Sequence, residues 1–226
     1  HRIDNWRAEL PSHFYRELGE VAFEGFVTAE QLTPEEANQR EFTPMHTGQR
    51  WGSKWEYGWF RGKVRLPGGG RGPRGGRGIA GQRIALRADL GGESICFVNG
   101  VVAGGIDHGH REITLTRSAE PGATYDILIE AYAGHAPTYC HAGPIPPERK
   151  PEPDPGPTRA LIGRSTYGIW EELAYQLWLD VETLYQLRNS IDQDSLRVAE
   201  IDAGLRDITV IVDLELPLEE RLKTFQ

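Results

Sequence analysis

The residues whose types and spacing could perform chemistry gather in the segment Ile106-Asp107-His108-Gly109-His110-Arg111. Two histidines separated by one residue, beside a carboxylate, could ligate a metal ion, and His135, Cys140 and His141 could complete a ligand set. However, the spacing matches neither a CxxC nor an HExxH pattern. The sequence therefore predicts no metal site in this chain.

The same segment has a second interpretation, based on the hydrogen-bonding capacity of Asp107. An aspartate in a turn accepts hydrogen bonds from nearby backbone amides, and it could also accept them from Arg111. This favours Asp107 as a residue that shapes the loop. In a further alternative, Asp107, His110 and Arg111 line a polar cleft at the edge of a β-sandwich and are candidates for contact with a substrate.

A second candidate site is the tryptophan-rich run that starts at position 51. Its sugar-stacking candidates are Trp51, Trp55 and Trp59, because the apolar faces of sugar rings stack on indoles. Tryptophans two to four residues apart also pack together in protein cores, so core packing is the competing interpretation.

A catalytic constellation is not recognisable in the sequence. The chain contains no GxSxG elbow, P-loop or GxGxxG motif. Glycosidases need two opposed carboxylates, whereas the neighbouring Glu171 and Glu172 would point in different directions from a helix and are predicted to be surface charges. The sequence therefore predicts no catalytic residue.

Composition limits the classes of protein to which this chain can belong. The chain has 226 residues, of which 38% are hydrophobic and 26% charged, so it can bury a sizeable core. A net charge of −8 argues against a nucleic-acid partner, and the short Arg/Gly-rich run at 70–77 is predicted to be a surface loop. Cys96 is predicted to be a small core residue and Cys140 a loop residue. With no signal peptide or membrane span expected, a cytoplasmic location is the default.

The elements that must position these residues follow from short alternating runs separated by Gly, Pro and Asn. Residues 41–135 contain predicted strands at 57–66, 82–89, 94–98, 101–103, 112–116 and 124–132. Asn99-Gly100 supplies the two positive φ values of a type I′ hairpin turn. The pattern predicts a mainly β protein, an antiparallel β-sandwich.

The segments on either side of residues 41–135 have patterns other than that of a β-sandwich. Residues 1–40 form a lead-in with a predicted helix at 2–18, a strand at 21–27 and a helix that starts at Thr33. Residues 136–160 are a proline-rich connector, and 161–226 hold the end of a predicted strand at 158–165 and then a C-terminal α-helical extension. The first of its helices begins near Gly168, and two more are predicted at 196–214 and 218–226. The predicted apolar stripe of the first helix comprises Trp170, Leu173, Leu177, Val181, Leu184 and Leu187.

Several motifs occur in an order that resembles the N-terminal region of cytosolic-type α-mannosidases of glycoside hydrolase family 38. They are Trp51-Gly52-x-x-Trp55 with Trp59-Phe60-Arg61, Arg83 to Glu93, Phe97-Val98-Asn99-Gly100, Gly105 to Glu112, and Glu130 to His135. The resemblance implies a jelly-roll, galactose-binding-like sandwich in front of a zinc-dependent retaining mannosidase domain. That domain begins with a His-x-Asp motif, which this chain lacks. The resemblance therefore assigns no catalytic or zinc residue here.

The expected function is that of a non-catalytic N-terminal domain of an α-mannosidase, which packs against its own catalytic domain. Zinc and the contact with α-mannosides would belong to the parent enzyme. One alternative is a free-standing carbohydrate-binding β-sandwich module. Another is a structural domain that forms a homo-oligomer.

Overall fold

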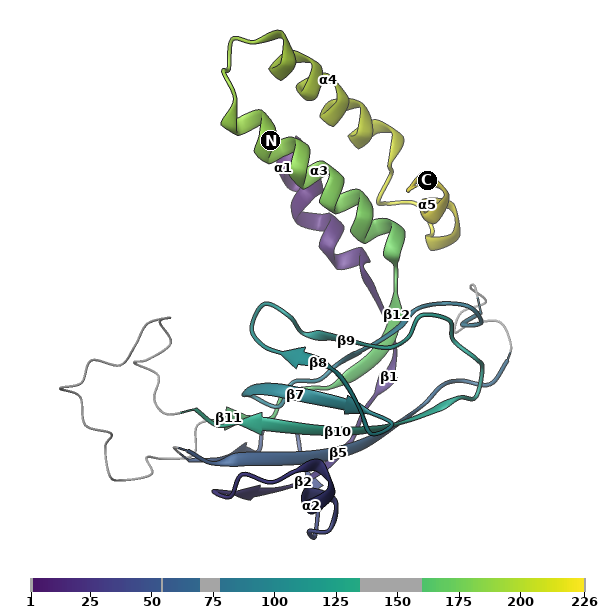
Figure 1. Ribbon diagram of the computed structural model, residues 1–226. Coiled ribbons are helices and arrows are strands. Elements are labelled where there is room, and N and C mark those ends of the chain that lie inside the picture. The colour runs from purple at the N-terminus through teal and green to yellow at the C-terminus, as the bar shows by residue number, and fades with distance from the viewer. Residues whose placement is uncertain (1, 54, 70–77, 135–159, 226) are drawn as a thin grey trace, which may run out of the picture.

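The computed structural model of the protein describes residues 2–53, 55–69, 78–134 and 160–225. The fold consists of a β-sandwich with a group of helices at one end (Figure 1). The helices are α1 (Arg2–Glu9), the 3-10 helix η1 (Leu10–His13), α2 (Pro34–Asn38), α3 (Glu172–Ser190), α4 (Leu196–Ile211) and α5 (Leu218–Thr224). The strands are β1 (Tyr15–Glu20), β2 (Phe23–Thr28), β3 (Thr43–Met45), β4 (Arg50–Trp51), β5 (Tyr57–Arg65), β6 (Ile84–Arg87), β7 (Glu93–Val98), β8 (Val101–Ile106), β9 (Glu112–Thr116), β10 (Thr124–Tyr132), β11 (Ala160–Leu161) and β12 (Thr166–Trp170).

The described strands pair antiparallel in two large sheets and one small one. The orders are β1-β12-β6-β9, β3-β2-β5-β10-β7-β8 and β11-β4. The predicted fold class, mainly β and antiparallel with a C-terminal helical extension, is confirmed. The turn at Asn99 and Gly100 is also confirmed, with φ values of 51° and 79°.

The main core lies between the two large sheets. Alternation along β5 directs Phe60 and Val64 into it, and Cys96 joins them from β7. Burial raises the pKa of the Cys96 thiol to about 12, so this cysteine behaves as a small apolar residue, as predicted. Cys140, which is predicted to be a loop residue, lies outside the described residues.

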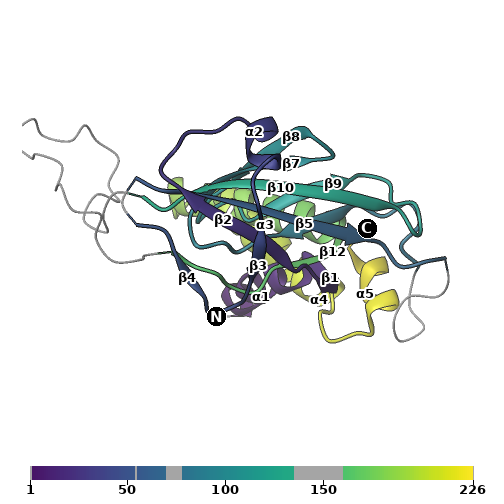
Figure 2. The same ribbon diagram turned by 90° about the horizontal axis from the view of Figure 1, so that it is seen from below.

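The outer face of the six-stranded sheet is partly covered by α2 (Figure 2). Thr33 accepts a hydrogen bond from the backbone amide of Glu36, and the Glu36 side chain accepts one from the amide of Thr33. This capping box confirms the predicted helix start. Because α2 covers the sheet, Trp59 is buried on the face opposite to Phe60.

The ends of the chain differ from the prediction. The helix predicted at 2–18 stops at His13, after Pro11, and the chain becomes strand β1 from Tyr15. In the described part of the strand predicted at 158–165, only β11 is extended in a sheet, and the region around Gly168 is strand β12 rather than the start of a helix. The physical reason is the antiparallel pairing of β1 with β12, in which Tyr15 lies opposite Trp170. Local periodicity does not report pairing between segments so far apart in sequence.

The predicted sandwich boundaries, 41–135, were therefore too narrow. β1 and β2 come from the predicted lead-in, and β12 lies between β1 and β6 in the four-stranded sheet. The predicted connector at 136–160, except residue 160, and the whole Arg/Gly-rich run at 70–77 lie outside the described residues.

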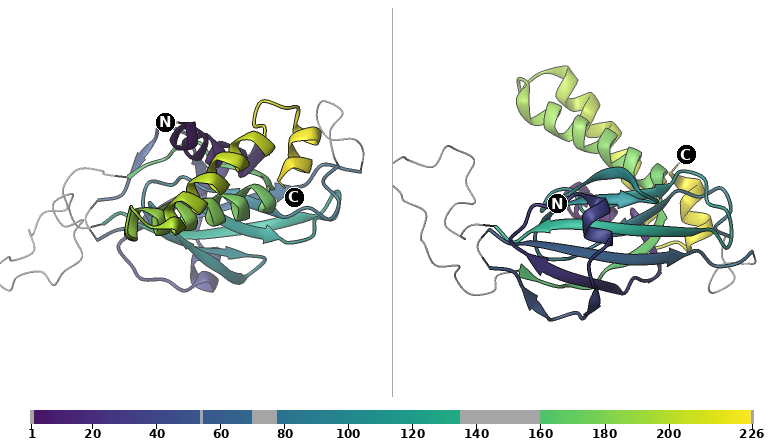
Figure 3. Two further views of the ribbon diagram at one scale, coloured as in Figure 1. Left: turned by 90° about the horizontal axis from the view of Figure 1, so that it is seen from above. Right: turned by 60° about the horizontal axis from the view of Figure 1, so that its bottom comes forward.

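The helical group has its own apolar cluster, which joins α1 and η1 to α3, α4 and α5. It is formed by Trp6, Leu10, Phe14, Ala174, Val181, Ile201, Leu205, Val212, Leu214, Leu222 and Phe225. Figures 1 and 3 show α3 and α4 side by side as an antiparallel pair. The predicted stripe on α3 is wrong in part, because Leu173, Leu184 and Leu187 are exposed while Ala174 and Val181 are buried. None of the described helices has both the length and the apolar content needed to cross a bilayer.

The close approach of β1 and β12 generates a prediction for Gly168→Ala. A Cβ atom at this position would lie 2.4 Å from the carbonyl oxygen of Arg16. We expect the substitution to lower the free energy of unfolding by roughly 1–3 kcal/mol, since the strands must separate to accept the methyl group. Urea unfolding followed by circular dichroism measures this change.

The matched control is Gly204→Ala in α4, where a Cβ atom would meet nothing within 4 Å. There we expect a gain of roughly 0.5–1 kcal/mol, because alanine favours the helix. A Gly168→Ala protein as stable as the unaltered chain would contradict the β1–β12 pairing.

Candidate functional site

The predicted Asp107 loop connects β8 to β9 at an edge of the sandwich. Asp107 Oδ1 accepts hydrogen bonds from the backbone amides of Gly109 and His110, both at 2.7 Å. The Asp107 amide in turn donates to the carbonyl of His110 at 3.0 Å. These contacts show that Asp107 shapes the loop through backbone amides, which confirms the loop-shaping interpretation.

A polar hollow of about 720 Å³ adjoins this loop. The loop crosses from one large sheet to the other, since β8 and β9 belong to different sheets. Asp107 and His110 both line it, together with Ser94, Glu112 and Arg117. Arg111 is exposed and is not among the lining residues. The structure thus brings two of the three predicted cleft residues together.

The electrostatics of the loop are dominated by the backbone. The amides of His110 and Gly109 hold the pKa of Asp107 below its ordinary value. The His110 Nδ1 atom lies 3.2 Å from Asp107 Oδ1, on a largely exposed side chain. An exposed carboxylate with a lowered pKa is ionised at neutral pH, so it is suited to accept hydrogen bonds and not to donate a proton.

The three predicted sugar-stacking residues do not form a platform. Trp51 is 3% exposed, donates a hydrogen bond to the carbonyl of Leu90 at 2.7 Å, and packs edge-on against Phe60. Trp59 is fully buried beneath α2, and only Trp55, at 46% exposure, reaches the surface. The core-packing interpretation is therefore correct for both: Trp51 belongs to the main core, and Trp59 packs with Ala37 of α2 and with Phe42 on the outer sheet face.

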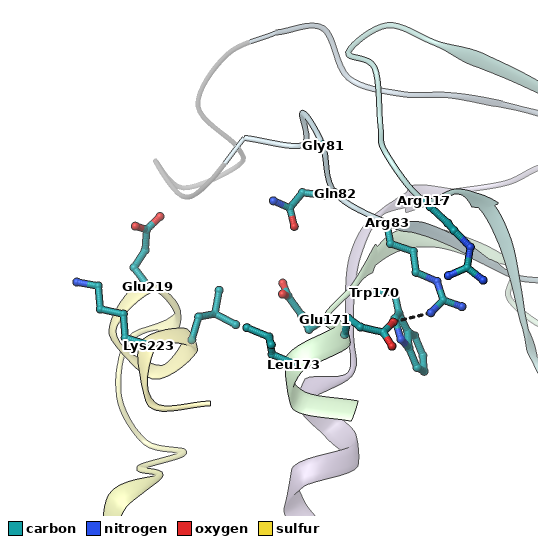
Figure 4. Close-up of a pocket in the computed structure, with 11 residues that line it drawn as sticks. Gly81, Gln82, Arg83, Arg117, Trp170, Glu171, Leu173, Glu219 and Lys223 are labelled. Carbon is teal, nitrogen blue, oxygen red and sulfur yellow. Dashed lines mark hydrogen bonds and ion pairs between the residues drawn. The ribbon is translucent and has the colours of Figure 1, made fainter. Parts of the chain in front are cut away.

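A second hollow, of about 650 Å³, lies where the sandwich meets the helical group (Figure 4). Glu219 and Lys223 of α5 form one side, and Arg83, Arg117 and Trp170 form the other. Sequence reasoning did not identify this hollow, because it depends on where α5 folds back against the sandwich.

Ion pairs at this junction connect the two parts of the molecule. Arg83 contacts Glu172 at 2.6 Å and donates to Thr114 Oγ1 at 2.8 and 3.1 Å. Arg16 lies 3.4 Å from Glu171, whose side chain is only 10% exposed. The prediction that both glutamates are surface charges is thus wrong for Glu171, whereas Glu172 is exposed as predicted and is paired with Arg83. Residue 171 ends the extended segment after β12, and its amide bonds to the carbonyl of Phe14, which turns its side chain inward.

These pairs hold the carboxylates in structural roles. The hydrogen bond from Gln176 and the contact with Arg83 hold the pKa of Glu172 below its ordinary value. Among the described residues, no group of three or more His, Cys, Asp or Glu side chains is arranged to hold a metal ion. His135, Cys140 and His141, which could have completed a metal set, lie outside the described residues.

Antiparallel sheets that pack face to face, with strands contributed by both ends of the chain and helices at one end, define a jelly-roll type of β-sandwich protein. Residues 20–187 match the family described as "Alpha-mannosidase, jelly roll domain". The chain belongs to this family.

Other comparisons give only distant similarity. Among solved structures, a β-glucuronidase from Ruminococcus gnavus in complex with D-glucuronic acid has 13% identity and a TM-score of 0.46, covering 69% of this chain and 29% of that chain. The β-glucuronidase of Faecalibacterium prausnitzii has 13% identity and a TM-score of 0.41, covering 69% and 31%. The chain therefore spans less than a third of either enzyme. No match was found among curated proteins.

The lowered pKa values generate a prediction that nuclear magnetic resonance can test. Asp107 and Glu172 should both titrate below the ordinary values for their side chains. Because its pKa is lower in the folded state than in the unfolded state, such a carboxyl group stabilises the fold at pH values above its unfolded-state pKa. That contribution is lost as the pH falls through the folded-state value.

Arg83→Ala should raise the pKa of Glu172 toward its ordinary value, because an adjacent positive charge is removed, and it should leave the pKa of Asp107 unchanged. Carboxyl chemical shifts followed against pH in both proteins measure this difference. An unchanged Glu172 midpoint in Arg83→Ala would show that the ion pair is not formed in solution.

Proposed function

We propose that this chain is a non-catalytic N-terminal domain of an α-mannosidase and that it packs against the catalytic domain of the same enzyme. The observation that carries the proposal is the family match, which extends over residues 20–187. In this proposal the zinc ion, the nucleophile and the α-mannoside substrate all belong to the following domain, and the parent enzyme acts in the cytoplasm.

The helical group offers the surface for packing in this proposal. Leu196 at the start of α4 and Ile211 at its end are 76% and 67% exposed, and Val210 is exposed next to Ile211. On α3, the exposed apolar side chains are Leu173, Leu184 and Leu187. Apolar side chains gathered on exposed helices are typical of surfaces that contact another protein domain. A homo-oligomer would use the same face, and a concentration-dependent mass of the isolated chain would reveal it.

The Asp107 loop has a defined place in this proposal. It faces the substrate cleft of the catalytic domain, where the ionised Asp107 and the exposed His110 and Arg111 would contribute polar groups to the rim. The alternative of a free-standing carbohydrate-binding module on the tryptophans receives less support, since only Trp55 of that set is exposed.

The proposal predicts the coding sequence that follows residue 226. It should continue in the same reading frame into a second domain that opens with a His-x-Asp motif. Sequencing the gene downstream of this point tests the proposal directly. A stop codon immediately after residue 226 would exclude a covalently attached catalytic domain.

A pair of substitutions tests whether the helical face is covered in the full-length protein. Leu196→Ser with Ile211→Ser should change the stability of the isolated chain by no more than about 0.5 kcal/mol, because both side chains are exposed. In the full-length protein the same pair should cost roughly 1–3 kcal/mol, since apolar contact area is lost. Urea unfolding of both proteins measures the difference.

The control is Val101→Ser at the β7–β8 hairpin, an exposed apolar residue of the sandwich away from the helical group. It should be nearly neutral in both proteins. Equal effects of the Leu196 and Ile211 pair in the isolated and full-length proteins would exclude this face as the packing surface.

A further inference from the structure

A groove of about 780 Å³ lies on the outer face of the six-stranded sheet, away from both hollows described above. Its floor is formed by the central strands β2, β5 and β10 with the end of β7, and its walls by α2 and by β3 with its following residue. Figure 2 shows α2 above these strands. The volume falls within the range of about 300–1,000 Å³ typical of small-molecule sites.

The wall formed by α2 is held firmly over the sheet. Ala37 of α2 and Phe42 after it pack on Trp59 and Leu128, which closes one side of the groove. The guanidinium of Arg61 lies 4.3 Å from the ring centre of Phe42, so this arginine is fixed between the wall and the floor.

The floor carries two ion pairs in neighbouring rows of the sheet. Arg61 Nε and Nη2 both donate to Glu24 Oε2, at 3.0 and 2.8 Å. In the next row, Lys63 Nζ lies 2.9 Å from Asp126 Oδ1. Register places Leu128 opposite Arg61 and Phe97 opposite Leu128, so an apolar strip continues the first row.

This arrangement excludes several classes of ligand. A phosphate or nucleic acid would meet cations that are already paired, beside the carboxylates of Glu24, Glu35 and Asp126. A purely apolar ligand would remove two ion pairs from water without compensation. An added peptide strand needs a free sheet edge, whereas β5 and β10 are paired on both sides.

A neutral ligand rich in hydroxyl groups matches the hydrogen-bonding groups that the two ion pairs leave unused. Both hydrogen bonds of Arg61 end on one carboxylate oxygen, and among the described residues no other contact engages Glu24 Oε1. The Lys63 ammonium has three donors, of which Asp126 occupies one. Each ion pair can therefore accept from and donate to adjacent hydroxyls, while the strip of Leu128 and Phe97 contacts the C–H face of a ring.

We propose that this groove binds a neutral carbohydrate, with Glu24–Arg61 and Lys63–Asp126 as its hydrogen-bonding pairs and Phe97 beneath the sugar ring. The inference concerns a property of the 226-residue chain itself and does not depend on the proposed function. It places sugar recognition on the sheet face beside α2 and not on the tryptophan-rich run.

The experiment titrates the 226-residue chain with neutral mono- and disaccharides, including mannose and glucose, and follows backbone amide shifts by NMR. We expect at least one sugar to cause saturable shifts at Lys63, Asp126 and Phe97. Lys63→Ala with Asp126→Ala should weaken this binding by about tenfold or more, equivalent to about 1.4 kcal/mol. The double variant keeps the net charge and removes only exposed side chains.

The matched control is Arg197→Ala with Glu200→Ala, which removes an exposed ion pair of α4 and should leave sugar binding unchanged. Glucuronate should bind more weakly than glucose, because its negatively charged carboxylate is repelled by the carboxylates that line the groove. The proposal is overturned if none of the neutral sugars shifts groove residues, if the Lys63 and Asp126 variant binds equally well, or if glucuronate binds more tightly than glucose.

Discussion

The antiparallel pairing of β1 with β12 is the constraint on which the rest of the structure depends. It joins residue 15 to residue 170 and completes a four-stranded sheet whose strands come from both ends of the chain. Gly168 permits it, because any larger residue would collide with the backbone of Arg16. Burial at this seam raises the pKa of Tyr15 to about 12 and leaves its hydroxyl protonated against Thr166 at 3.0 Å.

The same pairing determines how the helices attach to the sandwich. β1 follows η1 and β12 precedes α3, so two neighbouring strands connect the two parts of the molecule (Figure 1). Phe14 then packs against Trp170, Tyr175 and Trp178 at centroid distances of 5.4–5.9 Å. Two strands with an aromatic cluster and ion pairs restrict rotation much more than a single linker would. The exposed helical face is therefore held in one orientation relative to the Asp107 loop.

Features that depend on contacts between residues close in sequence could be predicted, whereas features that depend on contacts between distant segments could not. The Asn99-Gly100 turn, the Thr33 cap and the loop contacts of Asp107 depend on residues within a few positions, and sequence reasoning found all three. The helix expected at 2–18 has an apolar periodicity typical of a helix, but its last part forms strand β1. That strand pairs with β12, about 150 residues away. Trp59 could be recognised as apolar, yet its burial on the outer sheet face depends on α2 crossing above it.

The groove beside α2 illustrates the same limit for a binding surface. Glu24, Arg61, Lys63 and Asp126 are ordinary charged residues at alternate positions of three strands, and such alternation alone predicts only a solvated sheet face. Their pairing becomes visible only when register places Glu24 opposite Arg61 and Lys63 opposite Asp126. The exposed pairs contribute little to stability. A fold that places a capped helix beside such pairs, and continues the row of one pair with Leu128 and Phe97, has the mixed character that a ligand with hydroxyl groups and an apolar face requires.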